Sequence, residues 1–246
     1  MTIFVAELLG TMMLVLLGDA VVANVSLNKS GMKGAGSIQI TFAWGLAVLL
    51  PAFIFGNASG AHFNPALSIG LAIDGTIGWD TLPTYIGGQF AGAFIGAILV
   101  YILYKKHFDE TPDVGTQRGV FCTGPSIRSP LFNLISEIVG TFVLVFAIKG
   151  VPANIVPGVG NLFVFGVIVS IGMSLGGLTG YAINPARDLG PRIAYAVLPF
   201  KEKDPDWGYA WIPVIGPIIG AIIAVLLYQS LSGMEGFFAS PLDLFS

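Results

Sequence analysis

The sequence predicts an all-α integral membrane protein with six transmembrane helices, two re-entrant half-helices and an inverted internal repeat. Three observations support this prediction. Of the 246 residues, 54% are apolar and only 10% are charged, whereas a soluble domain carries about 25% charged residues. Six apolar stretches are long enough to cross a bilayer, and the mean hydropathy is +0.83. The two halves of the chain share motifs in matching places.

The six predicted spans follow from length, because a hydrocarbon core of about 30 Å needs ~20 mostly apolar residues per helix. They cover roughly 3–25, 36–56, 81–104, 131–149, 157–178 and 208–231. Two shorter apolar pieces, 64–74 and 184–197, would each cover only about half of the bilayer as helices. On the third span Gly88, Gly92 and Gly96 form overlapping GxxxG motifs, which allow helices to approach closely.

The repeat is visible in two pairs of motifs. Residues 6–11 read AELLGT and residues 136–141 read SEIVGT, while residues 59–66 read SGAHFNPA and residues 179–186 read TGYAINPA. Each half therefore contains two spans, a half-span that begins with Asn-Pro-Ala, and a third span. Because three is an odd number of crossings, the second copy is expected to be upside down relative to the first.

The expected organisation is one channel-like membrane domain over residues 1–246. Its two repeats would cover approximately 1–104 and 131–232, joined by a loop at 105–130. Inverted repeats of this kind place the functional site near the midplane, where the two copies meet.

The paired half-spans begin with the same three residues. These are Asn64, Pro65 and Ala66 in the first half, and Asn184, Pro185 and Ala186 in the second. Proline suits the first position of a helix, and asparagine caps the backbone N–H groups from the position before it. Inversion would bring the two helix N-termini together at mid-membrane. Their dipoles and amide donors would then favour the oxygen of a passing solute and repel cations, protons included.

Several classes of function are disfavoured by composition. The 11 Lys and Arg residues are scattered and the net charge is -3, so we expect no nucleic-acid partner. The single cysteine, Cys122, rules out a disulfide within the chain. With only two histidines, we also expect no metal site. We find no nucleophile–base pair and predict no catalytic residues, no cofactor and no enzymatic activity.

The doubled motif, together with Arg187 and Asp188 after its second copy, resembles the aquaporin (major intrinsic protein) family. The sequence is most similar to its glycerol-conducting branch, the aquaglyceroporins or glycerol uptake facilitators, and the resemblance runs from Glu7 to Gly220. It implies an aquaporin-like bundle that passes glycerol, other small uncharged solutes and some water, and excludes ions and protons. It also implies a homotetramer in the lipid bilayer of the cell (plasma or inner) membrane.

By the same resemblance, the selectivity filter consists of Trp44, Gly172, Tyr181 and Arg187. Arg187 would donate hydrogen bonds to solute hydroxyls, opposite an apolar corner made by Trp44 and Tyr181. Water-selective relatives usually carry histidine where Gly172 stands, so the glycine is expected to leave room for a larger solute. Glycerol channels more commonly carry phenylalanine at the position of Tyr181. The added hydroxyl leaves open the preference among water, glycerol, urea and hydrogen peroxide.

Four further polar residues are expected to support the pore. Glu7 and Glu137 would accept hydrogen bonds from the irregular loops before the half-helices, as the resemblance implies. His62 would line the pore or brace its loop. Asp188 fits the glycerol branch, although a carboxylate in a first turn also simply favours the helix dipole. Pro191 is expected to interrupt the second half-helix.

Two alternatives remain open at this stage. The first is a water-selective channel of the same fold, against which Gly172 argues. The second is an ion-coupled secondary transporter, a class that also uses inverted repeats and broken helices. Coupling would need carboxylates, and only Glu7, Glu137 and Asp19 lie within the spans.

The two indicators of orientation disagree. The resemblance implies that both termini are cytoplasmic. Of the 11 basic residues only Lys149 lies on the side of the termini, while the other ten, from Lys29 to Lys203, lie on the opposite side. The positive-inside rule alone would place the termini outside. We follow the resemblance.

Overall fold

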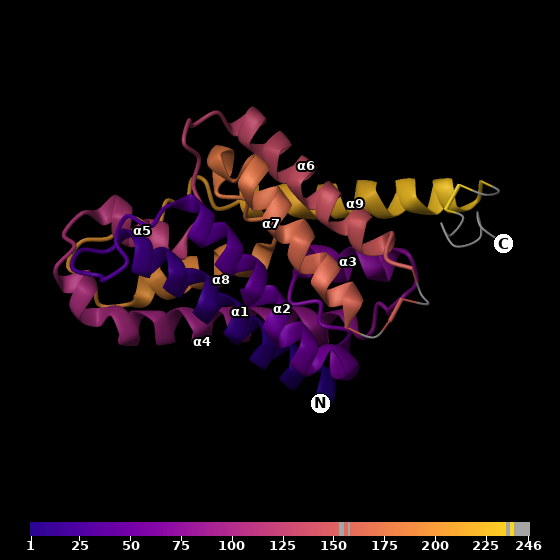
Figure 1. Cartoon of the computed structure of the whole chain (residues 1–246), viewed down its shortest axis with the longest axis horizontal. Helices are drawn as coiled ribbons and strands as arrows, with labels where there is room; N and C mark the ends of the chain where they lie inside the picture. Colours follow the sequence, from indigo (N-terminus) through magenta and orange to yellow (C-terminus); the bar gives the residue numbers. More distant parts are fainter. Residues whose placement is uncertain (153–154, 157, 235–236, 239–246) are drawn as a thin grey trace.

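The computed structural model describes residues 1–152, 155–156, 158–234 and 237–238. Over these residues the chain is helical and contains no strand (Figure 1). The helices in chain order are α1 (Thr2–Ser26), α2 (Ser37–Ser59), α3 (Pro65–Ile73), α4 (Leu82–Asp109), α5 (Val114–Phe121), α6 (Pro130–Lys149), α7 (Val159–Thr179), α8 (Pro185–Val197) and α9 (Ile212–Ser232). Six of them, α1, α2, α4, α6, α7 and α9, are long and apolar enough to cross a membrane. The predicted fold class is confirmed.

The segment 105–130, which we expected to be a loop, contains helical structure. Helix α4 continues to Asp109, where an ion pair between Lys105 and Asp109 supports its last turn. Helix α5 then forms a short cap, and its N-cap Asp113 accepts a hydrogen bond of 2.7 Å from the backbone N–H of Thr116. Hydropathy misses both pieces because they are polar and lie beyond the apolar span.

Pro191 does not interrupt the second half-helix, contrary to expectation. Helix α8 runs through it from Pro185 to Val197. Proline has a backbone φ angle compatible with a helix, so its place in α8 removes one hydrogen bond without ending the helix.

Close packing of backbones joins the helices in each half. On α4, a Cβ atom added at Gly88 or Gly96 would lie 2.7 Å from the carbonyl oxygen of Phe4 or Met12 on α1, and one added at Gly92 would overlap that of Leu8. In the second half, a Cβ atom added at Gly220 of α9 would overlap the carbonyl oxygen of Ile138 on α6. The predicted glycine row is therefore a helix contact, and it has a counterpart in the other half.

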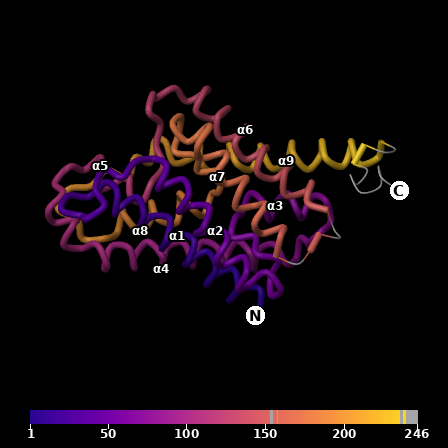
Figure 2. The backbone as a smooth tube through the Cα atoms, in the orientation of Figure 1, coloured from indigo at the N-terminus to yellow at the C-terminus, as the bar shows by residue number. Residues whose placement is uncertain are grey.

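The two half-helices lie inside the bundle formed by the long helices (Figures 1 and 2). Helix α3 packs against α9, and α8 packs against α4, so each half-helix contacts a long helix of the other half. The start of α1 and the end of α9 lie away from α5 (Figure 2). This arrangement brings the N-termini of α3 and α8 together in the interior.

Candidate functional site

The two Asn-Pro-Ala motifs are joined by reciprocal hydrogen bonds. Asn64 Oδ1 caps α3 by accepting from Ala66 N at 2.9 Å, and Asn184 Oδ1 caps α8 by accepting from Ala186 N at 3.0 Å. The Asn64 amide also donates to the carbonyl of Ile183 at 2.9 Å, and the Asn184 amide donates to the carbonyl of Phe63 at 2.8 Å. Each amide group has two N–H donors, so one of them joins the halves and the other stays available.

The loops that precede the half-helices are held in an unusual backbone conformation. Ala61 and Phe63 have φ angles of 55° and 49°, and Tyr181 and Ile183 have φ angles of 38° and 45°. Positive φ is unfavourable for residues with a side chain and persists only where the surroundings enforce it. Both loops line the interior cavity.

Two buried carboxylates enforce these conformations. Glu7 accepts from the backbone N–H groups of His62 at 3.1 Å and Phe63 at 2.7 Å, and also from the hydroxyl of Ser59 and the amide of Gln89. Glu137 accepts from the backbone N–H groups of Ala182 at 3.0 Å and Ile183 at 2.8 Å, and from the hydroxyl of Thr179. These are the hydrogen bonds that the sequence analysis expects of the two glutamates.

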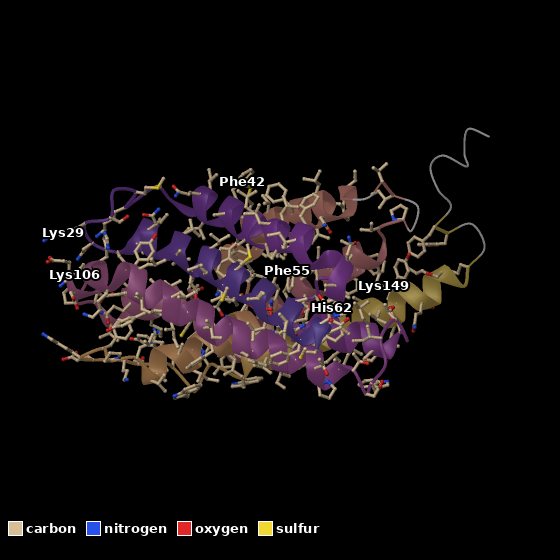
Figure 3. All side chains as sticks on the ribbon, turned by 90° about the horizontal axis from the view of Figure 1, so that it is seen from below. Lys29, Phe42, Phe55, His62, Lys106 and Lys149 are labelled. Atoms are coloured by element: carbon tan, nitrogen blue, oxygen red, sulfur yellow. The ribbon has the colours of Figure 1, made fainter. Side chains whose placement is uncertain are left out.

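His62 is held on both sides. Its Nδ1 lies 3.0 Å from the hydroxyl of Ser68, and its ring stacks on that of Tyr85 with centroids 4.3 Å apart. Gln89 donates both to Ser68 and to Glu7. Figure 3 shows His62 within the bundle, between the end that carries Lys29 and Lys106 and the end that carries Lys149. His62 therefore both lines the cavity and braces its loop.

A cavity of about 380 Å³ passes between the two motifs. Its polar lining includes both motif asparagines, Asn64 and Asn184, while much of the remaining wall is apolar. Trp44, Tyr181 and Arg187 line it on one side of the motifs, and Thr76 and Asn161 belong to its lining near the ends of α3 and α7. The cavity thus has a largely apolar wall with a small number of polar groups, which is typical of sites for small molecules.

Arg187 and Trp44 stack where α8 begins. The guanidinium carbon of Arg187 lies 3.9 Å from the centroid of the Trp44 ring. Only 8% of Arg187 and 4% of Trp44 is exposed. In the described ranges of the chain the guanidinium makes no hydrogen bond, although Asp19 lies near it. Its N–H donors are therefore free to bind a molecule in the cavity.

Gly172 lies beside the ring of Tyr181. It does not belong to the cavity lining found in the described residues. A Cβ atom added there would lie 2.9 Å from the Tyr181 ring and would overlap Thr41, and one added at Gly176 would lie 2.7 Å from the same ring. The space beside Gly172 is occupied by the Tyr181 ring, and the place of Gly172 in a selectivity filter stays a prediction.

Asp188 anchors a distant loop to α8. Its Oδ2 accepts from the backbone N–H of Thr123 at 2.7 Å and from the Thr123 hydroxyl at 2.6 Å. Its Oδ1 accepts from Arg192 Nε at 2.8 Å, and both side chains of this pair are fully buried. The residue next to Arg187 is thereby fixed in place.

Two residues near the site were missed or misread from the sequence. Gln89 links Glu7 to Ser68; its signal was an amide inside an otherwise apolar span. Asp19 was considered only as an ion-coupling group, but its Oδ1 lies 3.7 Å from Nη1 of Arg187. Its signal was a carboxylate in the middle of the first span.

The fold and the cavity define a class of protein, a multi-pass membrane protein built around two half-helices that meet end to end. The family described as Major intrinsic protein matches residues 1–228. The chain belongs to the major intrinsic protein family.

Relatives and a solved structure agree with this assignment. The chain is 52% identical over 231 residues to the "Probable glycerol uptake facilitator protein" of Thermotoga maritima, covering 93% of this chain and 99% of that protein. It is 49% identical over 232 residues to the "Glycerol uptake facilitator protein" of Bacillus subtilis, covering 94% and 85%. It is also similar to the aquaglyceroporin from Plasmodium falciparum, with a TM-score of 0.82, 29% identity, and coverage of 100% of this chain and 99% of that chain.

Proposed function

We propose that this protein is a passive channel for glycerol and other small uncharged solutes, with some water, and that it excludes ions and protons. One observation carries the proposal. The cavity between the two Asn-Pro-Ala helix starts has the Arg187–Trp44 stack in its wall. Such a wall is amphipathic, and so is glycerol, with hydroxyls on one edge and CH groups on the other. The names of the relatives support the same solute.

Passage would need only non-covalent contacts. The free N–H donors of Arg187 would bind a solute hydroxyl while the solute carbons contact the rings of Trp44 and Tyr181. Further along, the remaining N–H groups of Asn64 and Asn184 would bind the same oxygen. The positive ends of α3 and α8 would repel cations. No bond is made or broken, so the proposal assigns no catalytic residue and no cofactor.

We also propose how the protein is assembled and where it is located. The unit would be one channel domain of two repeats, 1–104 and 131–232, which assembles as a homotetramer in the cell membrane. The contacts of α3 and α8 with long helices of the opposite half support the single domain.

Both termini are proposed to be cytoplasmic, and thiol labelling tests this. Cys122 is buried, so a reporter cysteine is needed on each side of the bilayer. Lys33→Cys lies in the exposed loop after α1, and Asp80→Cys lies before α4, whose opposite end carries Lys106. A membrane-impermeant maleimide added to intact cells should label Lys33→Cys and not Asp80→Cys. The reverse pattern would place the termini outside.

Stopped-flow light scattering on proteoliposomes tests the transport function. Vesicles with the protein should re-swell rapidly in glycerol, and the rate should not respond to a proton or sodium gradient. The Tyr181 ring lines the cavity and occupies the space beside Gly172, and this observation favours one rival, a water-selective channel. Fast water flux without glycerol entry would establish that rival, while a gradient-dependent rate would establish a coupled transporter.

A further inference from the structure

Asp19 on α1 is a buried carboxylate that the proposed transport path does not use. Its side chain is fully buried. Over the residues that the structure describes, neither of its oxygens has a hydrogen-bond partner. Burying a carboxylate without partners is unfavourable, so its position needs a compensating charge. Arg187 supplies one, with Nη1 at 3.7 Å from Asp19 Oδ1.

Helix α1 supports both members of the Arg187–Trp44 stack through two consecutive residues. A Cβ atom added at Gly18 would overlap the six-membered ring of Trp44, so the glycine is what admits that ring. Asp19 follows directly and lies against Arg187. The cavity lining includes Trp44 and Arg187 and does not include Asp19. Asp19 therefore acts on the cavity through Arg187.

The neighbouring charges leave Asp19 as the counter-charge for Arg187. Asp188 is engaged by Thr123 and by Arg192, whose Nε and Nη2 donate to it at 2.8 and 2.9 Å. That carboxylate and that guanidinium compensate each other. Asp19 and Arg187 form the second pair, and the four side chains together are formally neutral.

We propose that Asp19 is a specificity-determining residue, the counter-charge that keeps the Arg187 constriction selective for neutral hydroxylated solutes over small anions. It offsets the positive charge of Arg187 at 3.7 Å without taking up an N–H donor in a hydrogen bond. Without it, an uncompensated guanidinium in a low-dielectric site would attract a small carboxylate strongly. The identity of the neutral solute rests on the proposed function, but the exclusion of anions does not.

The test is inhibition of glycerol flux by formate in proteoliposomes, with ionic strength held constant by gluconate, which is too large to enter. Asp19→Asn keeps the shape and removes the charge. The concentration of formate that halves the flux should be at least about ten-fold lower for Asp19→Asn than for the unmodified protein. A ten-fold change in affinity corresponds to about 1.4 kcal/mol, and the Coulomb attraction between two unit charges at close range in a protein can supply that free energy.

Three controls separate charge from packing. Asp19→Glu restores the charge and should restore resistance to formate. Thr11→Val removes a buried hydroxyl from the same helix that has no partner in the described part of the chain, and it should behave like the unmodified protein. In Asp19→Asn combined with Arg187→Gln the sensitivity to formate should disappear. Equal formate sensitivity in Asp19→Asn and the unmodified protein would overturn the proposal.

A second arm covers the case in which Asp19→Asn fails to fold. Arg187→Gln leaves Asp19 as the uncompensated charge, so methylammonium should then inhibit flux at least about ten-fold more strongly than in the unmodified protein. An unchanged response to methylammonium would count against Asp19 as a charge. If the unmodified protein conducts water and no glycerol, the glycerol channel is refuted, and water flux serves as the readout for both arms.

Discussion

The two half-helices begin alike but have different surroundings. Both α3 and α8 start with asparagine-capped proline, and both are preceded by a loop held by a buried glutamate. Near the start of α3 the supporting network contains one ionisable carboxylate, Glu7, together with His62, Ser68 and Gln89, and the ion pair of Asp74 and Lys149 lies at the far end of the helix. Around α8 it contains the buried ion pair of Asp188 and Arg192.

This difference separates two tasks. The shared part builds the junction at the centre of the membrane, where symmetry aligns two helix dipoles and two amide groups. The side chains that differ between the two half-helices determine the chemical surroundings of this junction. Beside α8 it is next to charge, because Arg187 lies in the first turn of α8 and Asp19 of α1 lies against it. Selectivity is therefore expected to depend more on the side chains around the start of α8 than on those around the start of α3.

The largest expected loss of stability comes from a substitution that breaks the buried ion pair of Asp188 and Arg192. Arg192→Met should lower the free energy of unfolding by about 3–5 kcal/mol, because it leaves Asp188 buried without its partner. Gln89→Leu in the first half should cost less, about 1–3 kcal/mol, since it removes neutral donors. Thermal unfolding in detergent, followed by circular dichroism, measures both. Arg118→Met is the control, because its ion pair with Asp204 is exposed and should contribute less than about 1 kcal/mol. Equal losses in Arg192→Met and Gln89→Leu would contradict the comparison.

The next effect tests the shared part of the junction. In the unmodified protein each glutamate accepts hydrogen bonds from backbone N–H groups. Glu7→Gln and Glu137→Gln each replace one of the two accepting oxygens by an amide NH2, which cannot accept. Each substitution should cost about 1.5–3 kcal/mol and reduce solute flux, because a hydrogen bond to a charged group is lost from a buried loop. Unfolding and stopped-flow measurements on the same preparations check this. If one substitution were silent, the two halves would not share this support.

Replacing a glycine at a close helix contact should lower the free energy of unfolding by similar amounts in the two halves. Gly92→Ala and Gly220→Ala each place a methyl group on a backbone carbonyl, of Leu8 and of Ile138. Each should cost about 1–3 kcal/mol, the usual effect of overpacking. Gly119→Ala on α5 meets no atom within 4 Å, so it should be neutral or slightly stabilising. A large loss in Gly119→Ala would show that alanine itself, and not the contact, is responsible.

The smallest expected effect concerns selectivity. Tyr181→Phe removes a hydroxyl and keeps the ring that packs over Gly172 and Gly176. The fold should be unaffected, and the ratio of glycerol to water flux should rise by about two- to five-fold, a change of less than ~1 kcal/mol in relative barrier. Paired flux measurements on one vesicle preparation give this ratio. A fall in the ratio would mean that the hydroxyl binds the solute.

The sequence by itself determined the elements whose signal is local. Hydropathy located the six spans because lipid requires continuous apolar helices of a set length. The Asn-Pro pair located the starts of α3 and α8, since capping depends on adjacent residues. The glycine row on α4 predicted close helix contact because its spacing of four places the glycines on one face.

Only the tertiary structure decided which side chains share space across distant parts of the chain. It placed the Tyr181 ring in the room left by Gly172, joined each asparagine amide to the opposite loop, and set Asp19 against Arg187, 168 positions further along the chain. None of these contacts leaves a periodic signal in the sequence. They arise when rigid helices pack, and packing then fixes which buried polar group meets which partner.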